Sequence, residues 1–269
     1  MGAVIEKDKA IRSLVQTAVR SYATGFEARH LREIDDPNGT INMKVHNVFI
    51  AVLGSDIQYY TALVRSLDSS LGNMLEGLAI AIAKLSYKVE RKVEGTLSGE
   101  QTSEIARILE EYRRRVKRPE RGDYVRLAGM RAGGVQVARH ESDYYLHDAA
   151  SGRHYLIELK IGGDLDNKKA RSEKQALLEQ YAILCNSLGS ADKVSIHFAT
   201  AYNRFGEGAP WRQERVRQFF ADDELLIGRD FWNFVCKSGA GYDVVLDEYK
   251  KNAGAIVAAL DKVKVAYLS

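Results

Sequence analysis

The feature that most constrains this chain is a pair of alternating segments joined by a short loop. Residues 155–161 read Tyr-Leu-Ile-Glu-Leu-Lys-Ile, and the loop before them, residues 149–152, reads Ala-Ala-Ser-Gly. Successive side chains of a β-strand point to opposite faces, so Leu156, Glu158 and Lys160 share one face. The aromatic and apolar residues between them share the other face, which we expect to be core. The pattern predicts a β-hairpin that carries charged side chains on one side.

The register of this hairpin would bring two carboxylates together. If residues 149–152 form the loop, Asp148 pairs with Arg153, and counting back places Asp143 opposite Glu158. Cross-strand partners have Cβ atoms about 4.5–5.5 Å apart, so two carboxylates there repel each other unless a cation lies between them. Magnesium is held by one or two carboxylates together with waters and substrate phosphates. With Lys160 on the same face, the hairpin predicts a magnesium site that hydrolyses phosphodiesters. The alternative is a surface hairpin whose charges serve solubility.

Composition narrows the class of protein. The 269 residues suit one large domain or two small ones, and the net charge of +3 permits a nucleic-acid partner without requiring one. Two cysteines, Cys185 and Cys236, do not make a disulfide framework and favour a reducing compartment, the cytoplasm. No apolar run is long enough to span a membrane, no Cys/His cluster has zinc spacing, and no glycine-rich loop fits a P-loop or dinucleotide site.

The order of elements predicts an α/β fold, a mixed central sheet flanked by helices. Apolar periodicity and turn residues predict helices near residues 4–21, 56–86, 101–117, 168–188, 211–221, 229–237 and 243–265, and strands near 134–147, 153–161 and 192–201. We therefore expect a mainly helical N-terminal region, residues 1–120, packed on a core of residues 121–269. Because no long linker separates them, the whole chain could equally form one domain.

Two basic segments follow the hairpin and are candidates for DNA contact. They contain Lys168, Lys169, Arg171 and Lys174 at the start of one helix, and Asn203, Arg204, Arg212, Gln213, Arg215 and Arg217 after the next strand. Phosphates favour helix N-termini, and Arg, Asn and Gln can pair with base edges. Each of these residues could instead belong to an ordinary solvated helix face. A third basic run, residues 113–118, reads as a solvated helix end, and a contact with the DNA backbone is a secondary interpretation.

Asp143 and Glu158-Leu159-Lys160, with the α/β order around them, resemble the PD-(D/E)XK nuclease superfamily; Ser142 stands where that motif has proline. Three longer strings, residues 157–169, 198–208 and 213–220, are similar to the MjaII/TdeIII group of type II restriction endonucleases. The resemblance covers roughly residues 50–250.

This resemblance implies a type II site-specific deoxyribonuclease that cuts double-stranded DNA at a short palindrome, GGNCC in that group. It also implies Mg²⁺ as cofactor, a homodimer, and a companion DNA methyltransferase that protects the host. The catalytic residues would be Asp143, Glu158 and Lys160, with the Leu159 carbonyl as a further metal ligand. Glu76 is a candidate for the extra acidic ligand of many such nucleases, or else a surface or capping glutamate. The helical N-terminal region would serve dimerisation or clasp the DNA.

Two other functions fit the same residues. One is a structure-specific or repair nuclease of the superfamily, which has the metal site but reads no sequence. The other is an inactive DNA-binding module whose metal site has decayed.

Overall fold

The computed structural model describes residues 2–130 and 134–268, and for residues 2–4 and 135–143 it describes the backbone alone. The chain divides into two compact units. Unit 1 combines Met1–Ile82 with Asp243–Ser269, and unit 2 is Ala83–Tyr242. The expected boundary near residue 120 therefore falls inside unit 2. The reason is that residues 88–98 form a strand of the central sheet, so that residues 83–120 belong to the same unit as that sheet.

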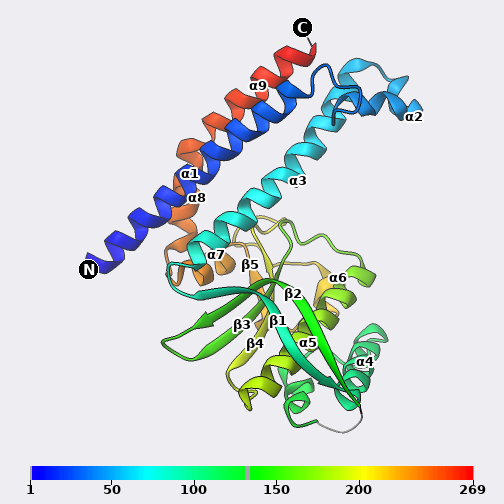
Figure 1. Cartoon of the computed structure of the whole chain (residues 1–269), viewed down its shortest axis with the longest axis vertical. Coiled ribbons are helices and arrows are strands. Elements are labelled where there is room, and N and C mark those ends of the chain that lie inside the picture. Colours follow the sequence, from blue (N-terminus) through cyan, green and yellow to red (C-terminus); the bar gives the residue numbers. More distant parts are fainter. Residues whose placement is uncertain (1, 131–133, 269) are drawn as a thin grey trace. The chain divides into compact units, whose positions relative to one another are not determined.

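Unit 2 is built on a mixed five-stranded sheet (Figure 1). Its strands are β1 (Lys88–Ser98), β2 (Val135–Asp148), β3 (Arg153–Leu159), β4 (Val194–Thr200) and β5 (Leu225–Ile227), and they lie in sequence order. The pairs β1–β2 and β2–β3 are antiparallel, whereas β3–β4 and β4–β5 are parallel. This confirms the predicted α/β fold with a mixed central sheet.

Helices cover both faces of this sheet. On one face, α4 (Gly99–Arg113) and α5 (Asn167–Leu188) pack in the main core cluster, which includes the strand residues Leu156, Ile196 and Phe198. On the other face, α7 (Arg229–Cys236) brings Phe231 within 6.1 Å of Tyr144, ring centre to ring centre. Both Leu156 and its neighbour Ile157 are fully buried. The prediction that only one face of this strand is core is therefore wrong. A strand that is covered by helices on both sides buries side chains on both of its faces.

Local signals explain where the two long helices of unit 2 begin and end. At α4, the Ser98 hydroxyl accepts from the Gln101 amide at 3.1 Å and the Gln101 side chain accepts from the Ser98 amide at 2.9 Å, a capping box. At α5, the Asp166 carboxylate accepts from the Lys169 amide at 2.7 Å, and Gly189 ends the helix with φ of 66°. Short elements complete the unit: η2 (Arg121–Asp123), η3 (Val125–Gly129), α6 (Glu214–Arg217) and η4 (Asp222–Glu224).

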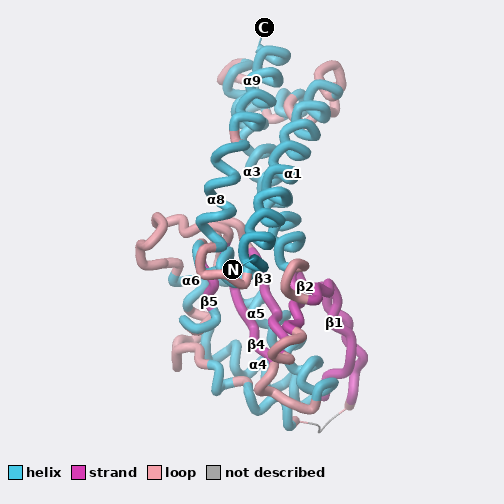
Figure 2. Tube along the Cα trace, turned by 90° about the vertical axis from the view of Figure 1, so that its left-hand side faces the viewer, coloured by secondary structure: helices cyan, strands magenta, loops and turns pink. Residues whose placement is uncertain are grey.

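Unit 1 is helical (Figure 2). It contains α1 (Gly2–Arg32), η1 (Asn42–His46), α2 (Val48–Ala51), α3 (Ser55–Ala83), most of α8 (Gly241–Asn252) and α9 (Gly254–Leu268). Its core cluster joins Phe26, Tyr59 and Val263, which come from the first, middle and last of the long helices. No helix among the described residues is both long and apolar enough to cross a membrane.

Most predicted elements are confirmed. Of the helix predicted over residues 211–221 only α6 forms, β5 was not predicted, and two further differences concern the ends of unit 2 and of the chain. The strand β1 lies where helical structure was expected, because its charged sequence gives little alternation and its pairing with β2 decides its conformation. The final helix predicted over residues 243–265 is two helices, α8 and α9, which are separated at Ala253.

The sheet contains a histidine that should make stability depend on pH. His197 on β4 lies beside the rings of Tyr155 and Phe234, and its Nδ1 is buried without a hydrogen-bond partner among the described residues. Burial lowers its pKa to about 4, although nearby Asp223 opposes the shift. Between that value and the ordinary pKa near 6.5, the unfolded chain binds more protons than the folded chain.

Stability should therefore fall as the pH falls from about 6.5 towards 4, by on the order of 1–2 kcal/mol between neutral pH and pH ~5. Urea unfolding at several pH values would measure this loss. His197→Gln should flatten the dependence, whereas His46→Gln at an exposed position should leave it unchanged. Equal slopes in all three proteins would contradict the assignment to His197.

Candidate active site

The predicted hairpin is present with its predicted register. Asp148 pairs with Arg153, and the strand pairs run back to Tyr144 opposite Ile157. The turn is closed by a hydrogen bond of 2.8 Å from the Gly152 amide to the Asp148 carbonyl, and Gly152 has φ of 64°. The backbone of Asp143 precedes Tyr144 in β2, but its side chain lies outside the described residues. That the Asp143 carboxylate faces Glu158 stays a prediction.

Asp148 holds the end of the hairpin in place. Its carboxylate accepts from the Ser151 hydroxyl at 2.9 Å and from the Lys237 ammonium at 2.9 Å. The hydrogen bond from Lys237 is the main reason that the pKa of Asp148 is lowered to about 2. This ion pair ties the hairpin turn to the residue that follows α7.

Glu158 and Lys160 lie together where β3 ends. Their side chains form an ion pair, as expected for residues two apart on one strand face. The Glu158 side chain is 13% exposed and that of Lys160 is 34% exposed, so both reach solvent from a largely buried strand. The Lys160 amide donates to the Ala199 carbonyl of β4 at 3.0 Å, which fixes the backbone just beyond the strand. The predicted shared face of Glu158 and Lys160 is confirmed.

Glu173 is a neighbour of this pair that sequence reasoning missed. It lies in the second turn of α5, and its Oε1 is 3.2 Å from the Lys160 Nζ. In the sequence, Glu173 is one of several charged residues at the start of α5, and no local pattern separates it from the others. A usable signal is topological: the helix that connects two parallel strands packs back over the sheet. Lys160 is therefore held between two carboxylates from different elements.

Lys174 is buried, so the prediction that it contacts DNA is wrong. Its side chain is 0% exposed, and its Nζ lies 2.6 Å from Glu224 Oε2. Glu224 Oε1 also accepts from the Tyr124 hydroxyl at 2.6 Å, and the Lys174 Nζ lies 5.0 Å from the centre of the Phe220 ring. Burial lowers the pKa of Lys174, and the Glu224 carboxylate opposes this shift. The residue faces inward because the helical stripe that packs on the sheet begins at Ala170, earlier than the first leucines suggest.

The loop after Lys160 is shaped by glycine and by a shared aspartate. Gly163 has φ of 64°, and a Cβ there would come within 2.7 Å of the Thr200 methyl group. The next residue, Asp164, accepts from Arg204 at 2.8 Å and from the Gln213 side chain at 3.1 Å. Arg204 and Gln213, both predicted to contact DNA, therefore link the segment after β4 to the loop that follows β3.

The other predicted DNA contacts separate into two groups. Asn203 shapes its own loop, because its side chain donates to the Ala209 carbonyl at 2.7 Å and accepts from the Phe205 amide at 3.0 Å. Arg217 pairs with Asp222 at 3.0 Å. The remaining candidates are wholly or partly exposed: Lys168, Lys169, Arg171, Arg212 and Arg215. A role in DNA binding stays a prediction for these five.

The residues fit a divalent cation that prefers oxygen ligands. Glu158 and Glu173 present carboxylates on both sides of one ammonium, a partly exposed and strongly charged arrangement. Magnesium needs only one or two protein carboxylates. Within the described side chains, no three His, Cys, Asp or Glu residues form a metal-binding group. Glu76 lies in α3 of unit 1, so its part in this site stays a prediction.

One comparison with known proteins identifies a family. The family model described as "Type II restriction endonuclease, HinfI" matches residues 7–253, which covers both units. Comparisons with curated proteins and with solved structures return no match.

Proposed function

The chain belongs to the HinfI family of type II restriction endonucleases, and we propose that it cuts double-stranded DNA with a magnesium site built from Asp143, Glu158 and Lys160. The observation that carries this proposal is Lys160 held between Glu158 and Glu173 at the end of β3. This is the place that the PD-(D/E)XK motif gives to its lysine. The family accounts for DNA cleavage, and the site accounts for where the chemistry takes place.

Each residue has a distinct part in the proposed mechanism. Asp143 and Glu158 would hold Mg²⁺, together with the Leu159 carbonyl. When bound, the ion lowers the pKa of water and neutralises charge on the phosphoryl group. Lys160 orients the attacking water and stabilises the negative charge that develops on the phosphate. Glu173 is a positioning residue, since its carboxylate contacts the Lys160 ammonium and, together with Glu158, fixes its place.

The finer specificity follows the sequence resemblance. We propose a short palindromic target, for which GGNCC, the site of the MjaII/TdeIII-like group, is the first sequence to test. A companion methyltransferase would protect the same site in the host. Digestion of a sequenced plasmid with Mg²⁺, followed by mapping of the ends, tests activity and site together. Discrete bands with shared ends support the proposal, whereas smears or cleavage that depends on DNA structure support a repair nuclease.

A two-fold site requires a catalytic centre for each strand, so we propose a homodimer. An exposed apolar segment in unit 1 supports this proposal and lies within the region expected to serve dimerisation. Phe49 and Val52 are 83% and 81% exposed. Four further large apolar residues of the segment are also exposed: Met43, Val45, Val48 and Leu53. Exposed apolar patches of this kind mark interaction sites.

Placing charges on this segment should separate the subunits. Phe49→Asp combined with Val52→Asp is expected to convert a dimer into a monomer, because two carboxylates would have to be buried without partners. Light scattering measures the change directly. Val257→Asp, at an exposed position on α9, is the matched control and should keep the wild-type mass. A wild-type protein that is monomeric with and without DNA would refute the dimer.

A further inference from the structure

A polar cleft lies between two segments of unit 2 that are about one hundred residues apart in sequence. Its volume is about 620 Å³. One wall is residues 115–119, which follow α4, and the other is residues 214–222, which contain α6. Buried Tyr112 and Phe220 also line it. Gln218 joins the walls, because its side chain donates to the backbone carbonyls of Tyr112 and Arg113 at 3.1 and 3.0 Å.

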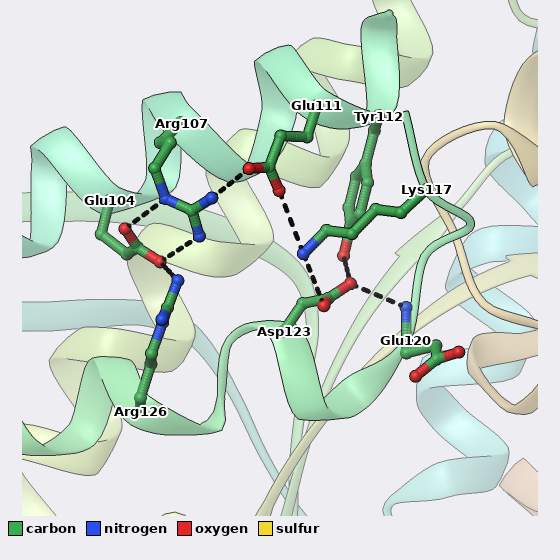
Figure 3. A network of polar contacts seen from close by, with 8 residues as sticks. All are labelled: Glu104, Arg107, Glu111, Tyr112, Lys117, Glu120, Asp123 and Arg126. Atoms are coloured by element: carbon green, nitrogen blue, oxygen red, sulfur yellow. Dashed lines mark hydrogen bonds and ion pairs between the residues drawn. The ribbon is translucent and has the colours of Figure 1, made fainter. Parts of the chain in front are cut away.

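The lining is rich in cations, but two of them already have partners. The basic residues are Arg115, Lys117, Arg118 and Arg217, against the acidic residues Glu214 and Asp222. Lys117 reaches between Glu111 and Asp123, at 3.1 and 2.6 Å (Figure 3). The same network ties α4 to the segment that follows it: Asp123 accepts from the Tyr112 hydroxyl at 2.7 Å. Lys117 therefore builds the wall of the cleft, and Arg217 is paired with Asp222 at 3.0 Å.

Arg115 and Arg118 are the cations left for a ligand. Neither side chain makes a hydrogen bond or ion pair with the residues that the structure describes. The backbone of Arg115 is unusual, with φ of 55°, and it occupies the position after the α4 C-cap that favours glycine. Its amide donates to the Tyr112 carbonyl at 3.0 Å and the Val116 amide donates to the Glu111 carbonyl at 3.0 Å, the hydrogen bonds of a Schellman motif.

Lys237 provides the comparison for this strained arginine. In the described part of the chain it is the other non-glycine residue with a positive φ, at 46°. Its ammonium pairs with Asp148 at 2.9 Å and lies 5.6 Å from the centre of the Tyr87 ring, so internal contacts offset its strain. The Arg115 side chain makes no such contact within the described chain. A ligand bound in the cleft would supply it.

We propose that this cleft binds phosphates of the DNA backbone through Arg115 and Arg118, apart from the site that cuts. This proposal rests on the proposed function. Arginine suits the task because its planar guanidinium pairs bidentately with phosphate. We take the occupant to be DNA rather than a free phosphate ion because the family to which the chain belongs cuts DNA.

The test compares two pairs of arginines from the same basic run. Arg115→Gly with Arg118→Gln removes two charges from the cleft. The control, Arg113→Gln with Arg114→Gln, removes two charges that pair with Glu110. The Arg113 Nη2 and the Arg114 Nε lie 2.6 and 3.9 Å from the Glu110 Oε1. Each variant has the same net charge. DNA affinity is measured by titrating labelled duplex at several salt concentrations in the absence of metal ions.

The cleft variant should lower the slope of log K against log salt by about 1 to 2, since each phosphate contact contributes about 0.9. The loss should be equal for duplexes with and without the target sequence, because phosphate contacts do not read bases. The control pair should keep a slope close to wild type.

Arg115→Gly alone separates binding from folding. Glycine suits the positive φ, so the melting temperature should stay the same or rise. DNA affinity should nevertheless fall by about threefold or more at low salt. A purely structural role for Arg115 predicts no loss of affinity in this variant.

Three outcomes would overturn the proposal. If wild type binds and cuts DNA but the cleft and control pairs have the same slope, only the cleft assignment is wrong. If calorimetry shows that inorganic phosphate binds wild type and not the cleft variant, while DNA affinity is unchanged, the cleft is a site for a free anion. If wild type neither binds nor cuts DNA with Mg²⁺, the proposed function and the cleft proposal both fail.

Discussion

Lys160→Ala should leave a protein that binds DNA but cuts it slower by a factor of about 100 to 1,000 or more. The ammonium is held between Glu158 and Glu173, so its removal takes away the cation that stabilises the developing charge on the phosphate. Asp143→Ala should abolish cleavage in the same way through loss of a metal ligand. Single-turnover cleavage with Mg²⁺ measures the rate, and duplex binding without metal ions measures the affinity.

Glu173→Gln is the graded comparison for this prediction. Glutamine can still accept a hydrogen bond from Lys160 but carries no charge, so the cleavage rate should fall by less than in Lys160→Ala. Lys168→Ala, at an exposed position on the same helix, should leave the rate at saturating DNA unchanged. A Lys160→Ala protein that cuts at the wild-type rate would show that the catalytic centre lies elsewhere.

Lys174→Met should destabilise the protein by roughly 3–5 kcal/mol, because it leaves a buried carboxylate without its cation. Glu224 is 2% exposed, and its remaining partners are the Tyr124 hydroxyl and the Ala221 amide, at 2.6 and 2.8 Å. Neither partner carries a charge. Urea unfolding that compares midpoints at constant slope measures the loss.

A double variant separates the ion pair from the volume of the side chain. Lys174→Met with Glu224→Gln should recover much of the lost stability, since glutamine can still accept from Tyr124 without a buried charge. Lys168→Met on the exposed side of α5 should change stability by less than about 0.5 kcal/mol. If Lys174→Met weakened DNA binding while stability stayed at the wild-type value, the inward placement of Lys174 would be wrong.

Local sequence determined most of the elements of unit 2. The alternation in residues 155–161 and the glycine that ends the loop before them predicted β3 and its register with β2. The leucine stripe predicted α5, and the apolar run in residues 194–200 predicted β4. These segments bury a consistent set of apolar side chains, so pattern and structure agree. The strand β1 lacks that pattern, and its conformation depends on β2 beside it.

The candidate site was predictable only in part. Glu158 and Lys160 lie two residues apart on one strand, so the period of two placed them on a common face. Glu173 required knowledge of how α5 crosses the sheet, which no local pattern contains. Lys174, the next residue, was expected to contact DNA but forms a buried ion pair with Glu224. One step along a helix rotates a side chain by about 100°, so Glu173 and Lys174 point in different directions.

The sequence by itself determined the hairpin, its turn and the common face of Glu158 and Lys160, because strand alternation and turn chemistry act over a few residues. Only the tertiary structure decided which charges meet across elements. Glu173 lies beside Lys160, Glu224 beside Lys174, and residues 115–119 face residues 214–222 across the cleft. Those contacts depend on the packing of helices on the sheet, which is set by the burial of many apolar side chains together rather than by the charged residues themselves.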